Sequence, residues 1–279
     1  MFKRTAEVTS PLTPTNAFLP VRFERPSWLN TVLCALFILF LLWSASSAGL
    51  SLSELLEGLP NMAIIGGEMV PPATDRVAPM AKAILVTFQM ALVGTVIGII
   101  ISIPVAVLAA RNTSPHPIVR HVTRSIVSFF RTVPDLAWAL FFVASVGLGT
   151  FAGTLTIIVD TIGFCARFFA EAMEEVDPGP SEALASIGAR PIDRVVVVLL
   201  PGALPSFINT SLFSLEKAVR SSVILGLVGA GGIGAELAVS MEMFRYDQAA
   251  TIVIMIFILV FAVEQFSSVV RNRLLRQSA

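Results

Sequence analysis

Charged residues are scarce in this 279-residue chain. Asp, Glu, Lys and Arg make up 14% of it, against roughly 25% in soluble domains. Hydrophobic residues make up 55%, which is more apolar surface than a soluble core of this size could bury, so lipid is the expected solvent for much of the chain. The formal net charge is zero, so the charge balance gives no indication of a nucleic-acid partner.

Cysteine and histidine are also rare, with two of each. Cys34 and Cys165 lie inside apolar runs, so a disulfide framework is not expected. His116 and His121 have no other ligands grouped around them, so we predict no metal site and no catalytic residue. The chain lacks the G-x-x-x-x-G-K-[ST] phosphate loop. If it depends on ATP, the ATPase must therefore be another chain.

What the sequence does contain is six long apolar runs that reach or approach the ~20 residues needed to cross a bilayer as a helix. They cover about 30–49, 83–110, 126–148, 154–173, 195–228 and 251–270. The pattern predicts an all-α integral membrane protein with six transmembrane helices. "LWSASSAG" after the first run also resembles a signal-peptide cleavage site, but 29 mostly polar residues precede the run, which favours a retained helix.

Lys and Arg are distributed unevenly over the segments that connect these runs. If both termini are cytoplasmic, thirteen lie on the inner side and three on the outer side, and the other three lie within the runs. Residues 1–29 and 271–279 are then cytoplasmic tails, and 177–194 is a cytoplasmic loop. Arg120, Arg124 and Arg131 alternate with apolar residues, which is typical of an amphipathic interfacial helix over 117–131 or of charge that fixes topology.

Two of the runs carry polar side chains on one helical face, and charge within a bilayer is costly. Asp160, Arg167, Glu171 and Glu174 share a face of the fourth run, and the fifth run has a similar stripe. Such faces indicate the walls of a hydrated path, or ion pairs within each helix, Arg167 with Glu171 and Glu216 with Arg220. We favour internal pairing for Arg167 and Glu171. The candidate path residues are Arg220, Ser221, Ser222, Glu216, Asn209, Arg167 and Glu171.

The stretch "GLVGAGGIGAEL" contains G-x-G-x-x-G at Gly229, Gly231 and Gly234, with Gly232 between them. After a strand this pattern indicates a dinucleotide site. Here no strand–helix–strand unit surrounds it, and it lies at the outer end of the fifth run. We predict instead that the glycines turn the backbone at a helix end and allow close packing.

The segment "EEVDPGPSEALASIGARPIDR" separates the fourth and fifth runs on the inner side. Ser181 is a candidate helix cap, and Gly188 and Pro191 are stop signals, so "SEALASIGA" is predicted to be a short helix. A tight loop would connect the two runs more simply. A short surface helix at this place is therefore expected to dock on a partner.

This segment resembles the EAA motif of ABC importer permeases. Glu182 and Ala183 match the motif, Leu184 stands where a second Ala is usual, Gly188 falls in register, Val198 replaces Ile, and Leu200-Pro201 fall in register. Three further stretches, "RTVPDLAWALFFVASVGLGTFAGTL", "TIGFCARFFAEAMEEVDPGP" and "VRSSVILGLVGAGGIG", are similar to permease subunits of phosphonate importers. The resemblance covers roughly 54–271.

The resemblance implies the type I importer (MetI-like) transmembrane domain in the inner membrane, working as a homodimer. In that family the inner loop is a coupling helix for a cytoplasmic ATPase dimer, which holds ATP and Mg while the permease binds no cofactor and is no enzyme. A periplasmic phosphonate-binding protein is the implied third partner. The implied coupling residues are Glu182, Ala183, Ser186, Gly188, Ala189, Arg190 and Pro201.

Several alternatives stay open. Phosphite, phosphate or another small anion could replace phosphonate as the cargo. An ion-coupled secondary transporter could use Asp160, Glu171 or Glu216 as a relay, although it leaves the docking helix unexplained. A membrane enzyme is disfavoured because no nucleophile and base motif is present.

Overall fold

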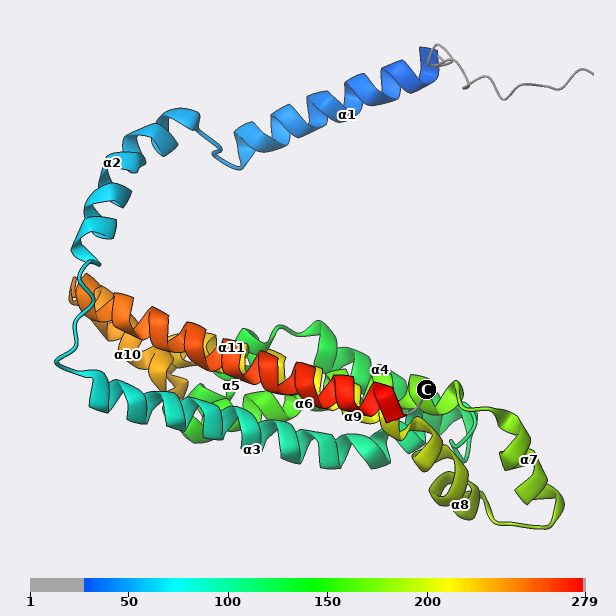
Figure 1. Ribbon diagram of the computed structural model, residues 1–279. Helices are drawn as coiled ribbons and strands as arrows, with labels where there is room; N and C mark the ends of the chain where they lie inside the picture. The colour runs from blue at the N-terminus through cyan, green and yellow to red at the C-terminus, as the bar shows by residue number, and fades with distance from the viewer. Residues whose placement is uncertain (1–27, 278–279) are drawn as a thin grey trace, which may run out of the picture. The chain divides into compact units, whose positions relative to one another are not determined.

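The computed structural model describes residues 28–277, and every regular element among them is helical (Figure 1). Most of the predicted tail 1–29 and the end of the tail 271–279 lie outside the described residues. The helices are α1 (Trp28–Ser47), α2 (Leu52–Glu68), α3 (Val77–Ala109), α4 (Pro117–Thr132), α5 (Asp135–Val146), α6 (Thr150–Glu174), α7 (Pro178–Ser186), α8 (Pro191–Arg194), α9 (Leu200–Leu225), α10 (Ile233–Glu242) and α11 (Tyr246–Gln277). The predicted all-α fold is confirmed.

The chain divides into two compact units, 1–62 and 63–279. The first unit contains α1, which is 20 residues long, about 30 Å at 1.5 Å per residue. None of its residues is buried, and its leucines, phenylalanines and tryptophans are exposed. A helix that is apolar all round and uncovered suits lipid. The chain after α1 forms α2, which continues into the second unit.

Five segments are long and apolar enough to cross a bilayer: α1, α3, α6, the stretch Pro191–Ala230 around α9, and Tyr246–Arg273 of α11. The predicted third run is interrupted instead. It consists of α4 and α5, which are bent by 89° at a short break and would make a sixth crossing only as a pair. Val133 is extended at the break because it precedes Pro134, which disfavours helical geometry in the residue before it.

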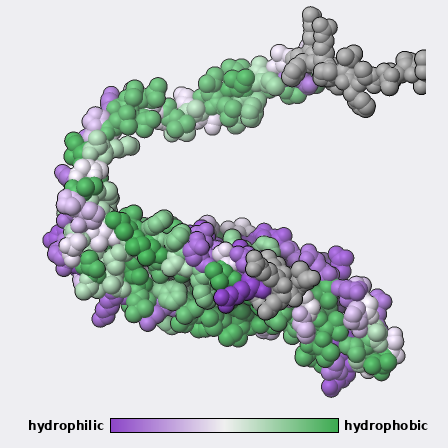
Figure 2. Space-filling model, viewed as in Figure 1, coloured by the Kyte–Doolittle hydropathy of each residue, from purple (hydrophilic) through white to green (hydrophobic). Residues whose placement is uncertain are grey.

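The second unit is a bundle with two different ends. α7 and α8 lie at one end, and α10 lies at the opposite end (Figure 1). The long helices between them present hydrophobic surface, for example along α3 (Figure 2). The predicted docking helix and the glycine-rich turn are therefore at opposite ends of the bundle.

Small residues hold α3 against α6. Gly94, Gly98, Ser102 and Ala106 recur every four residues along the buried side of α3, while Ile100 and other large residues face outward. A Cβ added at Gly98 would lie 2.6 Å from the Thr161 side chain. This inversion, with small side chains inside and large ones outside, is typical of helices packed in lipid, because van der Waals contact rather than water exclusion joins them.

The start of α9 accommodates a proline that an ordinary helix would not. Pro201 has no N–H for the carbonyl of Val197, and a π-helical turn, Val195–Leu199, precedes it. The N–H of Leu200 donates to the carbonyl of Val195 across this wider turn. Pro201 and Pro205 are thus both built into one helical segment. Phe207 of α9 stacks on Phe169 of α6 at a ring-centroid distance of 4.1 Å.

We predict that Gly98→Val lowers the free energy of unfolding by about 1–3 kcal/mol, because its side chain overlaps Thr161 at the closest part of the α3–α6 contact. Thermal unfolding of the full-length protein in detergent measures the effect. Gly67→Val is the matched control, since a Cβ there meets nothing within 4 Å. Equal melting temperatures for the two variants would contradict the packing role of Gly98.

Candidate functional site

The predicted inner-loop helix is α7, but its limits differ from the prediction. It begins at Pro178 rather than after Ser181, because the carboxylate of Asp177 caps it by accepting a hydrogen bond from Gly179 N at 3.0 Å. Prolines suit the first turn of a helix, where their missing N–H has no partner to lose. The helix ends at Ser186, so Gly188, Ala189 and Arg190 lie beyond it.

Gly188 closes α7 in the conformation that its φ of +84° allows. Its N–H donates to Ala185 O, and Ala189 N donates to Leu184 O, both at 3.0 Å. This pair of bonds is a Schellman motif, which satisfies the last carbonyls of a helix and requires a left-handed residue. The stop signal assigned to Gly188 is therefore confirmed by geometry.

The loop that contains α7 is exposed. No residue of α7 is buried, and Glu182, Ala183 and Ser186 are among its exposed residues. Ile187, directly after the helix, is 79% exposed. Arg190 pairs with Asp193 at 3.1 Å, and Pro201 lies away from the loop in the first turn of α9. The loop therefore presents an uncovered apolar side chain beside a short, exposed helix.

Apart from Glu174 and Arg220, the charges of α6 and α9 are held in three ion pairs. Arg167 Nε donates to Glu171 Oε1 at 2.8 Å, so the predicted pairing within the helix is confirmed. The predicted pair of Glu216 with Arg220 is wrong. Glu216 instead accepts from Arg271 of α11 at 3.0 Å, a contact that spacing along α9 cannot reveal.

The third pair joins two helices. Lys217 Nζ of α9 lies 2.7 and 2.9 Å from the two carboxylate oxygens of Asp160 in α6. Asp160 was predicted to lie on the polar face of its run, but no partner was predicted for it. The signal that could have found the pair was present, since each is a charge near the middle of its apolar run.

The remaining predicted path residues do not share one surface. Arg220 is exposed, and its Nε donates to Glu216 O at 3.4 Å. It is the one basic side chain of the described helices α6 and α9 without a carboxylate partner. Ser221 donates to Asp135 of α5 at 2.7 Å, whereas Ser222 is fully buried and donates to Val219 O. Asn209 is exposed nearer the start of α9.

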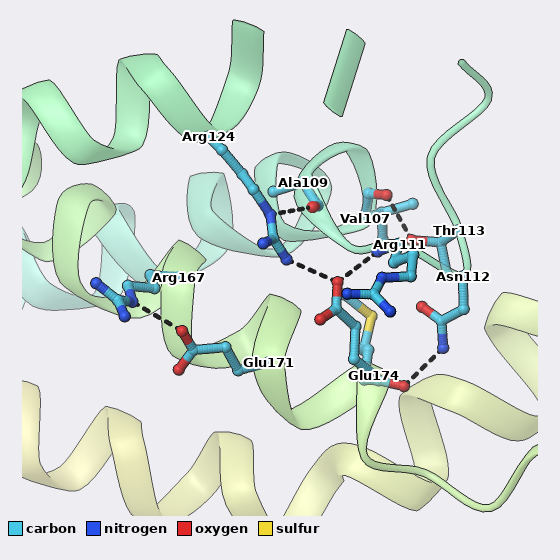
Figure 3. Close-up of polar contacts among 10 residues, drawn as sticks. Val107, Ala109, Arg111, Asn112, Thr113, Arg124, Arg167, Glu171 and Glu174 are labelled. Atoms are coloured by element: carbon cyan, nitrogen blue, oxygen red, sulfur yellow. Dashed lines mark hydrogen bonds and ion pairs between the residues drawn. The ribbon is translucent and has the colours of Figure 1, made fainter. Parts of the chain in front are cut away.

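Glu174 organises the end of α6 nearest α7 (Figure 3). One of its carboxylate oxygens accepts from Arg124 of α4 at 2.7 Å and from the backbone N–H of Arg111 at 2.5 Å. Asn112 donates to Met173 O at 2.8 Å. These contacts tie the α3–α4 connection to the end of α6, close to the place where α7 begins.

The glycine-rich turn has the structural role that was predicted. Gly229, Gly231 and Gly232 have positive φ values, and a Cβ on Gly234 would overlap the Val223 carbonyl. The turn is anchored from two sides: Gly149 N donates to Gly229 O at 2.9 Å, and Ile233 N donates to Thr87 Oγ1 at 2.8 Å. The turn follows a helix rather than a strand, which excludes the dinucleotide fold around it.

We predict that Lys217→Gln lowers the free energy of unfolding by about 1–3 kcal/mol, because it leaves the Asp160 carboxylate unpaired between two helices. Thermal unfolding in detergent measures this. Arg190→Gln breaks an exposed pair and is the control with little expected effect. Adding Asp160→Asn to Lys217→Gln should recover most of the loss, and a Lys217→Gln variant no less stable than Arg190→Gln would refute the role of the pair.

Comparison with known proteins gives the fold and family independently. The chain is 38% identical over 223 residues to a phosphite transport system permease protein, PtxC, of Stutzerimonas stutzeri, covering 80% of this chain and 81% of that protein. It is 42% identical over 207 residues to a phosphate-import permease protein, PhnE, of Mycolicibacterium smegmatis, covering 74% of this chain and 39% of that longer protein.

A solved structure of the MetNI methionine ABC transporter in an inward-facing conformation matches with a TM-score of 0.64 and 26% identity. The match covers 72% of this chain and 99% of the solved one. Residues 102–276 match the family described as the binding-protein-dependent transport system inner membrane component. With the all-helical bundle and its apolar spans, these matches show that the chain is a permease of the inner membrane and belongs to the binding-protein-dependent transport system inner membrane component family.

Proposed function

We propose that this chain is the subunit through which an ABC importer moves a phosphonate, or a related small phosphorus oxyanion, across the inner membrane by ATP-driven alternating access. The observation that carries the proposal is the exposed α7 loop, with Ile187 uncovered, at the end of the bundle opposite the glycine-rich turn. The named cargoes of two relatives, phosphite and phosphate, support the same chemical class.

The α7 loop is the proposed coupling element. The uncovered isoleucine and the exposed Glu182, Ala183 and Ser186 would lie in a groove of a cytoplasmic ATPase dimer, which binds ATP and Mg. Glu174 lies at the end of α6, where the loop begins, and it contacts Arg124 of α4 and the backbone of Arg111 after α3. A movement of the loop would therefore be transmitted to α6, α3 and α4 together. This chain then needs no catalytic group, because the ATPase supplies energy by shifting conformational populations.

In this proposal two copies of the chain enclose the path, and Arg220 faces the cargo. Its guanidinium has five N–H donors arranged to suit oxyanions, and no carboxylate neutralises it. Ser221 beside it is held by Asp135 of α5. The contact with cargo must stay weak, since a tight site would stall transport. Glu216, Arg167 and Glu171 contribute polar surface but are already paired.

At the outer end a periplasmic binding protein would deliver the anion. The glycines at 229, 231, 232 and 234 form the proposed gate, since their turn contacts both α3 and the α5–α6 connection. Both termini and the α7 loop are cytoplasmic in this arrangement, as the Lys and Arg distribution predicts.

An ion-coupled secondary transporter is the alternative from another class. It needs a carboxylate in the membrane that gains and loses a proton or a cation. Each of the three candidates is instead bound to a basic partner: Asp160 to Lys217, Glu171 to Arg167 and Glu216 to Arg271. Paired carboxylates favour the ATP-driven reading.

We predict that proteoliposomes containing the permease, its ATPase partner and its binding protein take up radiolabelled methylphosphonate only when ATP is enclosed with the ATPase. Arg220→Gln should reduce this uptake at least about tenfold, because one charge-assisted contact is lost. Arg220→Lys should retain part of it, since charge remains without the planar fork. Arg245→Gln, at the exposed α10–α11 turn, is the control.

Uptake that persists without ATP and collapses when an ionophore dissipates the ion gradient would overturn the ATP-driven mechanism. Normal uptake by Arg220→Gln would remove Arg220 from the path. Uptake of phosphite or phosphate in preference to methylphosphonate would change the cargo and leave the mechanism in place.

A further inference from the structure

A cavity of about 240 Å³ lies between α4, α6 and the end of α3, away from Arg220. At about 30 Å³ per water it holds several water-sized groups. Its lining is Ala109, Arg124, Val127, Ser128, Arg131, Arg167, Ala170 and Glu171. Its lining includes three arginines and one carboxylate, so the cavity carries a net positive charge. The contacts described above do not explain this charge.

One side of α4 lines the cavity, and the opposite side is apolar. Ile118, Val122, Ile126 and Phe129 form an exposed apolar stripe on this helix. Arg124, Ser128 and Arg131 lie on the other side, toward α6. A Cβ added at Gly163 of α6 would lie 3.0 Å from the backbone nitrogen of Arg131, so the two helices approach closely there. The amphipathic helix thus places Arg124 and Arg131 on the side nearer α6, where both remain exposed, and its apolar stripe on the other side.

The arginines differ in how they are held. Arg124 donates to Ala109 O at 2.9 Å and to Glu174, and Arg167 donates to Glu171, so each is neutralised and fixed (Figure 3). Arg124 uses two of its five N–H donors in these contacts. Arg131 has no ion-pair or hydrogen-bond partner for its side chain among the described residues. The cavity therefore has one uncompensated positive charge beside two positioned guanidinium groups.

We propose that this cavity is a second anion site, which takes a phosphate-type oxyanion with Arg131 as its free cation and Arg124, Arg167 and Ser128 as further donors. Arginine forks match the oxygens of phosphoryl groups in pairs. Glu171 repels an anion at its own side and thereby directs the ligand toward Arg131. The site concerns binding by this chain alone, so it stands whether or not the transport proposal holds.

The ligand chemistry has two sources, a free phosphate or phosphonate ion and the headgroup of an anionic phospholipid. The test uses full-length permease in dodecyl maltoside, a detergent without phosphorus. Phenylglyoxal modification of each arginine is followed by peptide mass spectrometry, with inorganic phosphate or with phosphatidylglycerol added. Arg120, on the same helix but outside the cavity, is the internal control.

We predict that a saturating ligand slows modification of Arg131 about tenfold when its concentration is ten times its Kd, because protection follows 1 + [L]/Kd. The modification rate of Arg120 should change less than twofold at the same ligand concentration. Arg167→Gln should weaken the protection of Arg131 about tenfold, since it removes a donor and frees Glu171. Arg120→Gln should leave the protection unchanged.

Protection by inorganic phosphate identifies a free oxyanion as the ligand. Protection by phosphatidylglycerol alone, and not by phosphatidylcholine, identifies an anionic headgroup. Modification of Arg131 that neither ligand slows, or equal protection of Arg120, would overturn the proposal. Because neither arm involves ATP, the ATPase or uptake, failure here is distinct from failure of the transport mechanism.

Discussion

The bundle depends on the close approach of α3 and α6. In a bilayer the hydrophobic effect does not drive helices together, because the lipid tails are as apolar as the side chains. Helix association therefore depends on van der Waals packing over the contact area. Gly94 and Gly98 provide this contact because they have no side chain where the helices meet, and the small Ser102 is buried on the same side of α3. With α6 fixed against α3, its other faces make three further contacts. Asp160 forms an ion pair with Lys217 of α9, and α4 packs closely against Gly163. Glu174 accepts a hydrogen bond from the backbone of Arg111, in the connection after α3.

Charged side chains in an apolar bundle need a partner of opposite charge. Residues that have such a partner within the chain are candidates for a structural role, and residues that lack one are candidates for binding a ligand. The pairs of Asp160, Glu171 and Glu216 join helices or stiffen one, and they leave these carboxylates engaged. Arg220 on α9 and Arg131 on α4 differ from these pairs, since both are exposed and neither has a carboxylate partner among the described residues. Both proposals share one physical basis: an arginine that no carboxylate neutralises keeps its N–H donors available for an anion that binds and leaves.

The sequence predicted local features better than contacts between distant residues. Apolar run lengths predicted the all-α fold, and the spacing of Arg167 and Glu171 predicted their pair, because both depend on neighbours along one helix. The partner of Glu216 could not be predicted, since Arg271 reaches it only after α11 has packed. Ser222 was placed on the path by its position in a motif, yet it is buried. The 89° bend between α4 and α5 in the third run was not predicted, because the apolar content of a run does not show where a helix is broken.

The central claim is that α7 transmits the energy of ATP hydrolysis, and Ile187 tests it most directly because its side chain is 79% exposed and changing it should not disturb the fold. The measurement is cargo-stimulated ATP hydrolysis by the reconstituted permease, ATPase and binding protein, comparing wild type with Ile187→Asp. Leu50→Asp, at a residue 77% exposed but far along the chain from α7, is the control. The account predicts that Ile187→Asp loses stimulation at least about tenfold while Leu50→Asp keeps it. Full stimulation in Ile187→Asp would contradict the account and make the α7 loop a tether.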